Sequence, residues 1–164
     1  MSRLAAEGEV IRVRKGLYWK GPKTRVGMPF PRPLDLGLEV AGPGSGPAGV
    51  SAAHLLGLTT QVPAVEQVAV PGRVPAPVPG VRFVSRSIER RIGGLRPVEV
   101  ALIEVLRDGP TLIEQPWTHV STVVEQLVDA GEVRPGVIAT QVGHEHHVAA
   151  RQRWNDLGIT EAAR

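Results

Sequence analysis

The sequence of 164 residues predicts an α+β fold, with a very small N-terminal module and a larger, mainly helical domain that contains a small β-sheet. Residues 9–20 alternate apolar and polar side chains with the period of two that is typical of strands. Residues 97–106 and 117–130 repeat apolar side chains at helical spacing instead. Two short runs rich in valine, 66–70 and 81–84, indicate strands of the sheet.

The composition narrows the class of protein. The chain is 42% hydrophobic and 21% charged, as globular proteins are. Its apolar runs are too short to cross a bilayer, and its first residues lack the apolar run of a signal peptide, so we expect no membrane partner. The absence of cysteine excludes disulfides, thiol nucleophiles and Cys-ligated zinc. A cytoplasmic location is the default expectation.

Charge alternates in blocks along the chain. Residues 1–32 hold eight Lys or Arg and two Glu, and residues 73–96 hold six Arg and one Glu. Residues 33–72 hold three acids and no base, and residues 97–164 hold ten acids and five Arg. Sixteen of the nineteen bases are Arg, the side chain suited to bidentate contact with phosphate and guanine. A polyanionic partner is therefore expected first.

The N-terminal residues predict a helix end followed by a hairpin. Residues 1–6 are expected to be the last part of a helix that Gly8 stops. A strand over 9–14, a Lys15-Gly16 turn and a returning strand over 17–20 then form a β-hairpin with a cationic tip.

The turn sets the register of this hairpin. A two-residue turn pairs Arg14 with Leu17 and Arg12 with Trp19, whereas a three-residue turn moves every side chain of one strand to the other face. The apolar surface of the hairpin exceeds what a six-residue helix covers. Residues 1–20 are therefore expected to pack against another part of the chain, to pair with a second copy, or to belong to a longer protein.

The elements that follow are marked by proline and glycine. Residues 22–33 are a stiff, basic, Pro-rich connector. A short helix over 34–41 is followed by a flexible turn over 42–49, and Ser51 caps a second helix over 52–58. The segment between the two predicted strands is too long for a tight hairpin. Three further helices are expected over 97–106 with Pro97 at the first position, over 117–130 ended by Gly131, and over 147–157 ended by Gly158.

Two sets of motifs resemble a known family. Residues 3–18 read RLAAEGEVIRVRKGLY and resemble the last part of a winged helix-turn-helix: the end of a recognition helix, a Glu-Gly break and a wing hairpin. Residues 56–63 read LGLTTQVP and are followed by VAVPG at 68–72 and an Ala-Leu-x-x-x-Leu pattern at 101–106. In this order the motifs are similar to the AbiEi-type antitoxins and regulators of bacterial type IV toxin–antitoxin systems.

The resemblance covers about residues 3–108 and carries an expected function. It implies a DNA-binding N-terminal part that represses its own operon, and an effector domain that acts against a nucleotidyltransferase-like toxin. The implied divisions are a partial winged-helix DNA-binding module over 1–21, a basic linker over 22–33, an antitoxin-like effector domain over 34–158 and a flexible tail over 159–164.

The wing supplies the candidate DNA-binding residues. From Arg12 to Arg25 the chain holds six cations and no acid, so contact with phosphates or entry into the minor groove is expected. The full candidate set is Arg3, Arg12, Arg14, Lys15, Lys20, Lys23 and Arg25. The alternative is a solvated hairpin whose charges protect an edge strand.

A second basic group has two interpretations. It consists of Arg82, Arg86, Arg90, Arg91 and Arg96. These arginines either extend the nucleic-acid footprint or balance the ten acids of the C-terminal segment within the fold. The second interpretation is favoured, because the two blocks are nearly equal, opposite in sign and adjacent in the sequence.

No catalytic constellation is evident, so an enzyme is not expected. His144, Glu145, His146 and His147 are zinc-ligand types, but their spacing is not that of a metalloprotease helix and predicts a solvated turn without metal. The glycine-rich residues 42–49 lack the Lys-Ser/Thr of a phosphate-binding loop, and no other cofactor motif occurs.

Three functions remain in order of preference. The first is a DNA-binding transcriptional regulator and antitoxin, bound to duplex operator DNA as a homodimer. The second is a protein-interaction module without DNA affinity of its own. The third is a metal-dependent enzyme that uses the histidines of residues 144–147. Salt-dependent DNA binding separates the first from the second, and metal analysis separates the third from both.

Overall fold

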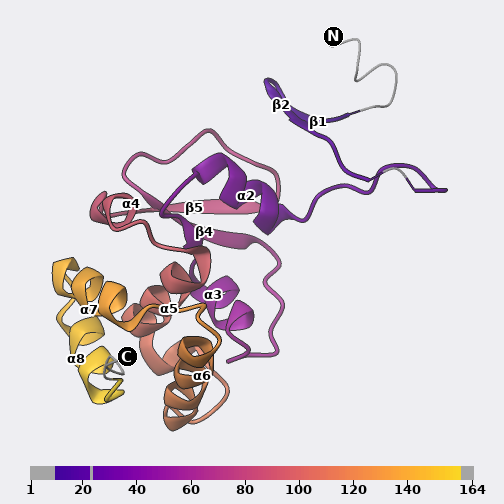
Figure 1. Cartoon of the computed structure of the whole chain (residues 1–164). Coiled ribbons are helices and arrows are strands. Elements are labelled where there is room, and N and C mark those ends of the chain that lie inside the picture. Colours follow the sequence, from indigo (N-terminus) through magenta and orange to yellow (C-terminus); the bar gives the residue numbers. More distant parts are fainter. Residues whose placement is uncertain (1–9, 23, 160–164) are drawn as a thin grey trace.

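The computed structural model describes residues 10–22 and 24–159 and confirms the α+β class (Figure 1). The described residues form seven α-helices, one 3-10 helix, a two-stranded hairpin and a three-stranded mixed sheet. In chain order they are β1 (Ile11–Arg14), β2 (Leu17–Trp19), α2 (Pro33–Ala41), β3 (Gly46–Pro47), α3 (Gly49–Leu55), β4 (Glu66–Pro71), β5 (Val81–Arg86), α4 (Glu89–Ile92), α5 (Pro97–Asp108), η1 (Gly109–Leu112), α6 (Thr118–Asp129), α7 (Pro135–His144) and α8 (Val148–Asp156). The helix expected over residues 1–6 and most of the expected tail lie outside the described residues.

The hairpin forms as predicted, with a change in register. β1 and β2 are antiparallel and are joined by a two-residue turn, and Arg14 pairs with Leu17. The register then shifts, so that Arg12 pairs with Tyr18 and not with Trp19. The expected pairing was wrong because a β-bulge places one extra residue in β1 between Arg12 and Arg14.

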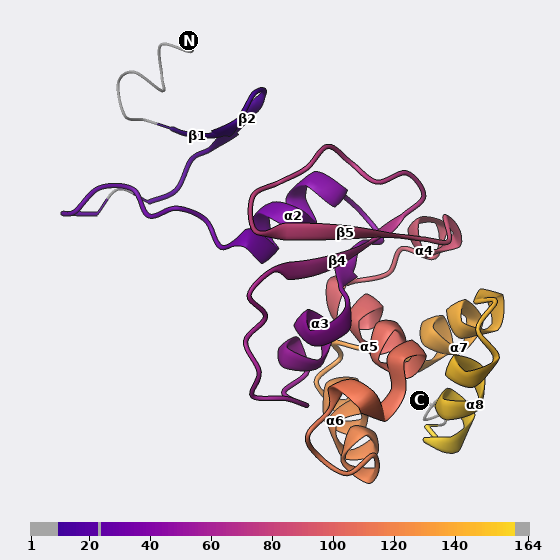
Figure 2. The same ribbon diagram turned by 180° about the vertical axis from the view of Figure 1, so that it is seen from behind.

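The hairpin is separated from the rest of the described chain. Both Figure 1 and Figure 2 show it beyond the three-stranded sheet and the helices, joined to them by the extended connector that leads into α2. The hairpin therefore does not pack against the sheet and helices that follow it, which was one of the three expectations for residues 1–20.

The sheet is built from both predicted strands and one that was not predicted. Its order is β3-β4-β5, with β3 antiparallel and β5 parallel to β4. Val68 and Val70 of β4 pack with α2, whereas Ala69 between them joins the larger core on the other side, where α3 and α5 lie. Figures 1 and 2 show α2 on one face of the sheet and α3 and α5 on the other.

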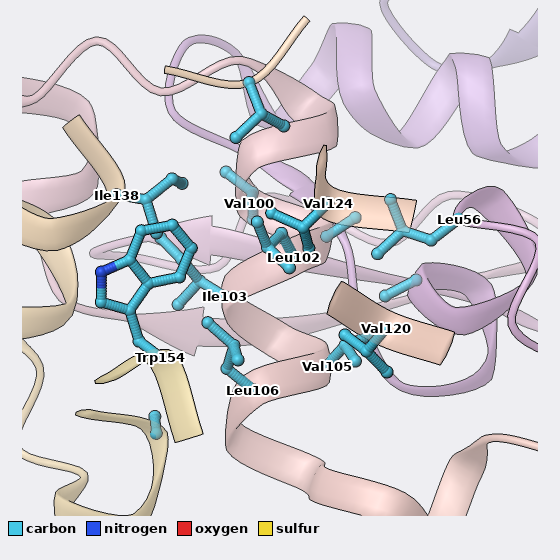
Figure 3. Packing of buried hydrophobic residues seen from close by; sticks show 14 of the residues in the cluster. Leu56, Val100, Leu102, Ile103, Val105, Leu106, Val120, Val124, Ile138 and Trp154 are labelled. Carbon is cyan, nitrogen blue, oxygen red and sulfur yellow. The ribbon is translucent and has the colours of Figure 1, made fainter. Parts of the chain in front are cut away.

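Helix α5 is the centre of the larger core. Pro97 begins it, as predicted, and every side chain from Glu99 to Leu106 is buried. Figure 3 shows how its apolar side chains meet those of four other segments, namely Leu56 after α3, Val120 and Val124 of α6, Ile138 of α7 and Trp154 of α8. Because each large apolar side chain contributes about 1.5–3 kcal/mol when fully buried, this helix fixes the positions of its neighbours.

The segment before α3 differs from its prediction. Residues 42–49 were expected to be a flexible turn, but Gly44 to Ala48 are buried and include β3. The following helix spans Gly49–Leu55 and not 52–58. Ser51 lies inside this helix and does not cap it; its Oγ accepts a hydrogen bond of 2.9 Å from the backbone N–H of Gln67.

The C-terminal helices are close to their predictions, with two additions. α6 and α8 match the expected segments to within one or two residues. α4 and α7 were not predicted, because α4 has four residues and the apolar residues of α7 are interrupted by glycine and threonine. No helix in the described part of the chain is long and apolar enough to cross a membrane.

Candidate nucleic-acid interface

The structure describes most of the predicted DNA-binding cations. Two of them, Arg3 and Lys23, lie outside the described residues. Four are exposed to solvent: Arg12, Lys15, Lys20 and Arg25. Arg14 is half-buried, and its Nη1 donates a hydrogen bond of 3.3 Å to the carbonyl of Lys15. These four predicted cations of the hairpin and connector are therefore directly accessible to solvent.

The pleat of the hairpin separates its charged and apolar side chains. Arg12 and its cross-strand partner Tyr18 are both exposed, whereas Ile11 and its partner Trp19 are both half-buried. Successive strand residues point to opposite faces, so Ile11 differs in exposure from Arg12, and Tyr18 from Trp19. At the bulge the alternation is lost, and Val13 and Arg14 are both half-buried. The exposed face carries the guanidinium of Arg12 beside an aromatic ring, which suits contact with a nucleic-acid backbone.

Four exposed cations of the hairpin and connector form no ion pair with any described residue. Within residues 10–22 and 24–159, Arg12, Lys15, Lys20 and Arg25 form no ion pair. The connector's last cation, Arg32, differs, because its Nε lies 2.8 Å from a carboxylate oxygen of Asp35. The four unpaired charges can therefore bind an external anion without first breaking an internal contact.

Two members of the second basic group, Arg86 and Arg90, are paired inside the fold. Arg86 donates from Nε and Nη2 to the two carboxylate oxygens of Glu104, at 2.8 and 2.6 Å. Arg90 donates from Nη1 to Glu104 and from Nε to Glu145, both at 2.7 Å, and Arg107 Nη1 donates to the other oxygen of Glu145 at 2.5 Å. The preferred interpretation, that these arginines balance the C-terminal acids, is confirmed for Arg86 and Arg90.

The other arginines of this group donate hydrogen bonds to backbone carbonyls or are exposed to solvent. Arg91 donates to the carbonyl of Pro71 at 3.4 Å, and Arg96 donates to the carbonyl of Gly131 at 2.6 Å. Arg82 is exposed on β5. None of these three forms an ion pair in the described part of the chain.

Glu104 holds the ion-pair network together. Its side chain is completely buried, as is that of Arg90. Burial alone would raise the pKa of the Glu104 carboxyl, but the hydrogen bond from Arg86 and the charge of Arg90 outweigh it, and the pKa is lowered. The carboxylate therefore stays ionised, and the network links β5, α4 and α5.

A second buried carboxylate fixes the start of α7. Glu99 accepts hydrogen bonds from Arg134 Nε at 2.8 Å and Nη2 at 2.6 Å, and also from the backbone N–H of Arg96 at 2.8 Å. Burial alone would raise the pKa of the Glu99 carboxyl, but the hydrogen bonds from Arg134 and Arg96 outweigh it, and the pKa is lowered. This glutamate satisfies an otherwise free N–H at the start of α5 and fixes Arg134, the residue before α7.

A groove of about 1100 Å³ lies between α4, α7 and the end of α6. Its apolar lining includes Ile92, which is 73% exposed, and Val128 and Val137. Glu89 and Asp129 are its acidic lining residues. Its polar lining residues include Thr140, Gln141 and His144.

The histidine-rich turn differs from its prediction in one residue. His144 and His146 are exposed, as expected of a solvated turn, but Glu145 between them is buried because it binds Arg90 and Arg107. The described residues contain no group of three His, Asp or Glu side chains that could hold a metal ion.

The third histidine, His147, has a structural contact. It caps α8, because its Nδ1 accepts a hydrogen bond of 3.2 Å from the backbone N–H of Ala150. We expect His147→Ala to lower the free energy of unfolding by about 1 kcal/mol, the usual size of a lost cap. His146→Ala, the control, should leave it unchanged, and urea titration measures both. Addition of a chelator should change neither, and a large loss of stability with chelator would contradict the prediction that no structural metal is bound.

No protein-family model matches the chain, and no curated protein matches it.

Proposed function

We propose that this protein is a DNA-binding transcriptional regulator and the antitoxin component of a bacterial type IV toxin–antitoxin system. The observation that carries the proposal is the contrast between two sets of cations. Arg86, Arg90 and Arg107 are neutralised by buried glutamates, whereas Arg12, Lys15, Lys20 and Arg25 have no ion-pair partner among the described residues. The winged-helix motifs of the same segment support a nucleic-acid partner over other polyanions.

In the proposed complex the hairpin is a wing on the phosphate backbone. Each Lys or Arg that neutralises a phosphate releases condensed counterions, so the contact stabilises the complex without reading sequence. A homodimer would place two wings on the two half-sites of a palindromic operator. The helical body, residues 34–158, is proposed to act against a nucleotidyltransferase-like toxin, a link that rests on the resemblance of residues 56–72 and 101–106.

The first test is the salt dependence of DNA binding. Each phosphate contact contributes about 0.9 to the slope of log affinity against log salt concentration. Arg12→Ala with Lys15→Ala is therefore expected to reduce the slope by up to about 1.8, measured by fluorescence anisotropy on a duplex of about 30 base pairs.

A matched variant controls for net charge. Arg73→Ala with Arg151→Ala removes two exposed arginines from the body of the protein and should leave the slope unchanged. Equal slopes for the hairpin variant and the wild type would show that Arg12 and Lys15 do not contact the DNA backbone.

The second candidate function is a protein-interaction module without DNA affinity. It is favoured by the groove beside α4 and α7, where Ile92 is largely exposed on an apolar lining. The same salt titration separates the two functions, because this alternative predicts no DNA retention even at low salt. A nucleotidyltransferase-like reading frame immediately downstream of the gene would support the antitoxin assignment.

A further inference from the structure

The connector contains a closed turn with an arginine and a valine at its tip. The backbone N–H of Thr24 donates to the carbonyl of Gly27 at 3.0 Å, and the N–H of Gly27 donates back to Thr24 at 3.1 Å. The hydroxyl of Thr24 donates to the same carbonyl of Gly27 at 2.5 Å. Gly27 has a φ of 106°, which other residues rarely adopt. Arg25 and Val26 are thereby held at the tip by an ordered backbone.

Val26 has no role in the packing of the fold. Its side chain is 99% exposed, the most of any large apolar residue in the described chain, and Phe30 further along the connector is 55% exposed. The preceding Arg25 is also exposed and has no ion pair among the described residues. An apolar side chain beside an unpaired guanidinium, both presented on a turn, is suited to a surface that is anionic and has apolar walls.

The connector holds this turn clear of the body. Figures 1 and 2 both show it extending away from the sheet and helices, to the right in the first view and to the left in the second. Proline at positions 22, 29 and 31 restricts the flanking backbone. The five steps from Lys20 to Arg25 span at most about 17 Å, half a turn of B-DNA, so a wing on the backbone and this turn can reach adjacent grooves.

We infer that the Thr24–Gly27 turn is a second DNA contact, which inserts Arg25 and Val26 into the minor groove beside the site of the wing. The inference rests on the DNA binding proposed above. The minor groove combines phosphates with apolar sugar walls, and its A·T-rich segments are narrow and attract arginine. Val26 would contact the sugars. Arg25 would favour A·T pairs, because no guanine 2-amino group projects into the minor groove there. The ligand class is therefore A·T-rich duplex DNA.

The test separates the minor groove from the major groove by base substitution. Three duplexes of one length carry A·T, G·C or inosine·C pairs in the central segment. Inosine lacks the guanine 2-amino group, so an I·C pair resembles G·C in the major groove and A·T in the minor groove. We expect the full-length protein to bind the A·T and I·C duplexes at least about 5-fold more tightly than the G·C duplex.

The variants identify the residues responsible. Arg25→Ala with Val26→Ala should abolish this preference, whereas Arg73→Ala with Val74→Ala should retain it. The control pair has the same residue types in the same order, and is exposed on the other Pro-rich segment of the chain. Arg25→Lys keeps the charge and should retain the salt slope while weakening the preference. Equal melting temperatures of the variants establish that folding is unaffected.

Each outcome decides between the inference and the function on which it rests. Binding that depends on Arg12 and Lys15 but is equal for I·C and G·C duplexes would overturn the minor-groove inference and leave the proposed function in place. Equal effects of the 25–26 and 73–74 variants would do the same. No binding to any duplex at low salt would overturn both, as would retention on anionic vesicles but not on DNA.

Discussion

Glu104→Gln is expected to lower the free energy of unfolding by about 3–5 kcal/mol, the usual cost of breaking a buried ion pair by removing one partner. Glu104 accepts three hydrogen bonds of 2.6–2.8 Å from Arg86 and Arg90. Arg90 is fully buried, and in the variant its guanidinium would have only Glu145 as an acidic partner. Glutamine has nearly the same volume as glutamate, so the loss of stability would come from the removed charge and not from a change in packing. Urea titration at neutral pH measures it.

Glu125→Gln is the matched control for this prediction. Glu125 is an exposed residue of α6, and no ion pair involves it within the described residues, so its loss should change the unfolding free energy by less than about 0.5 kcal/mol. If the two variants unfolded at the same urea concentration, the network around Glu104 would not contribute to stability.

The network also sets a pH dependence. The pKa of Glu104 is lower in the folded protein than its ordinary value of 4.5, so the folded state binds the proton less tightly than the unfolded state does. The resulting stabilisation is fully present above pH 4.5 and is lost as the pH falls through the lowered value. Wild-type stability should therefore fall more steeply below pH 4.5 than that of Glu104→Gln, and parallel curves would exclude this carboxylate as the cause.

Gly46→Ala is expected to have the other large effect on stability, a loss of about 3 kcal/mol or more. Gly46 lies in β3 against the first turns of α5. A β-carbon at this position would come within 2.4 Å of Val100 Cβ and 2.6 Å of the carbonyl oxygen of Pro97. Neither atom is the free end of a flexible side chain, so the strand and the helix would have to separate. Thermal unfolding followed by circular dichroism measures the shift.

Gly143→Ala provides the comparison. Gly143 lies near the end of α7, and a β-carbon there would meet no heavy atom within 4 Å. Because alanine has a higher helix propensity than glycine, this variant should be as stable as the wild type or more stable by up to about 1 kcal/mol. A Gly46→Ala protein as stable as Gly143→Ala would show that β3 and α5 are not in close contact.

The predictable parts of the fold are those with a strong local pattern. α5 and α6 follow from apolar spacing and from Pro97 and Gly131 at their boundaries. The parallel direction of β4 and β5 was not predicted, because it depends on contacts between residues distant in sequence. The unbroken apolar run from Val68 to Val70 does indicate a strand that is buried on both faces, as parallel strands are. The burial of residues 44–48 was missed because glycine and proline favour turns locally, while here they allow close approach to α5.

The exposure and pairing of the cations were predicted only in part, and DNA binding itself stays a prediction. The acid-free run of cations indicated most of the exposed charges of the hairpin, and charge balance indicated the internal pairing of Arg86 and Arg90 but not the exposed position of Arg82. The bulge that moves Arg12 opposite Tyr18 has no local signal. The partners of Arg90 were missed as well, although Glu99 and Glu104 inside an apolar helical run were a signal of buried pairing. Glu145 was obscured by its histidine neighbours.

The contact between Arg90 and Glu145 joins residues that lie 55 positions apart in the chain. During synthesis at about 5–20 residues per second, Arg90 leaves the ribosome several seconds before the carboxylate that neutralises it. Until then the guanidinium has Glu104 as its acidic partner, and the core around α5 lacks α7 and α8. A chain cut short before Glu145 would therefore keep an incompletely neutralised charge at the centre of its fold. Quality control by proteases should remove such fragments faster than the finished protein.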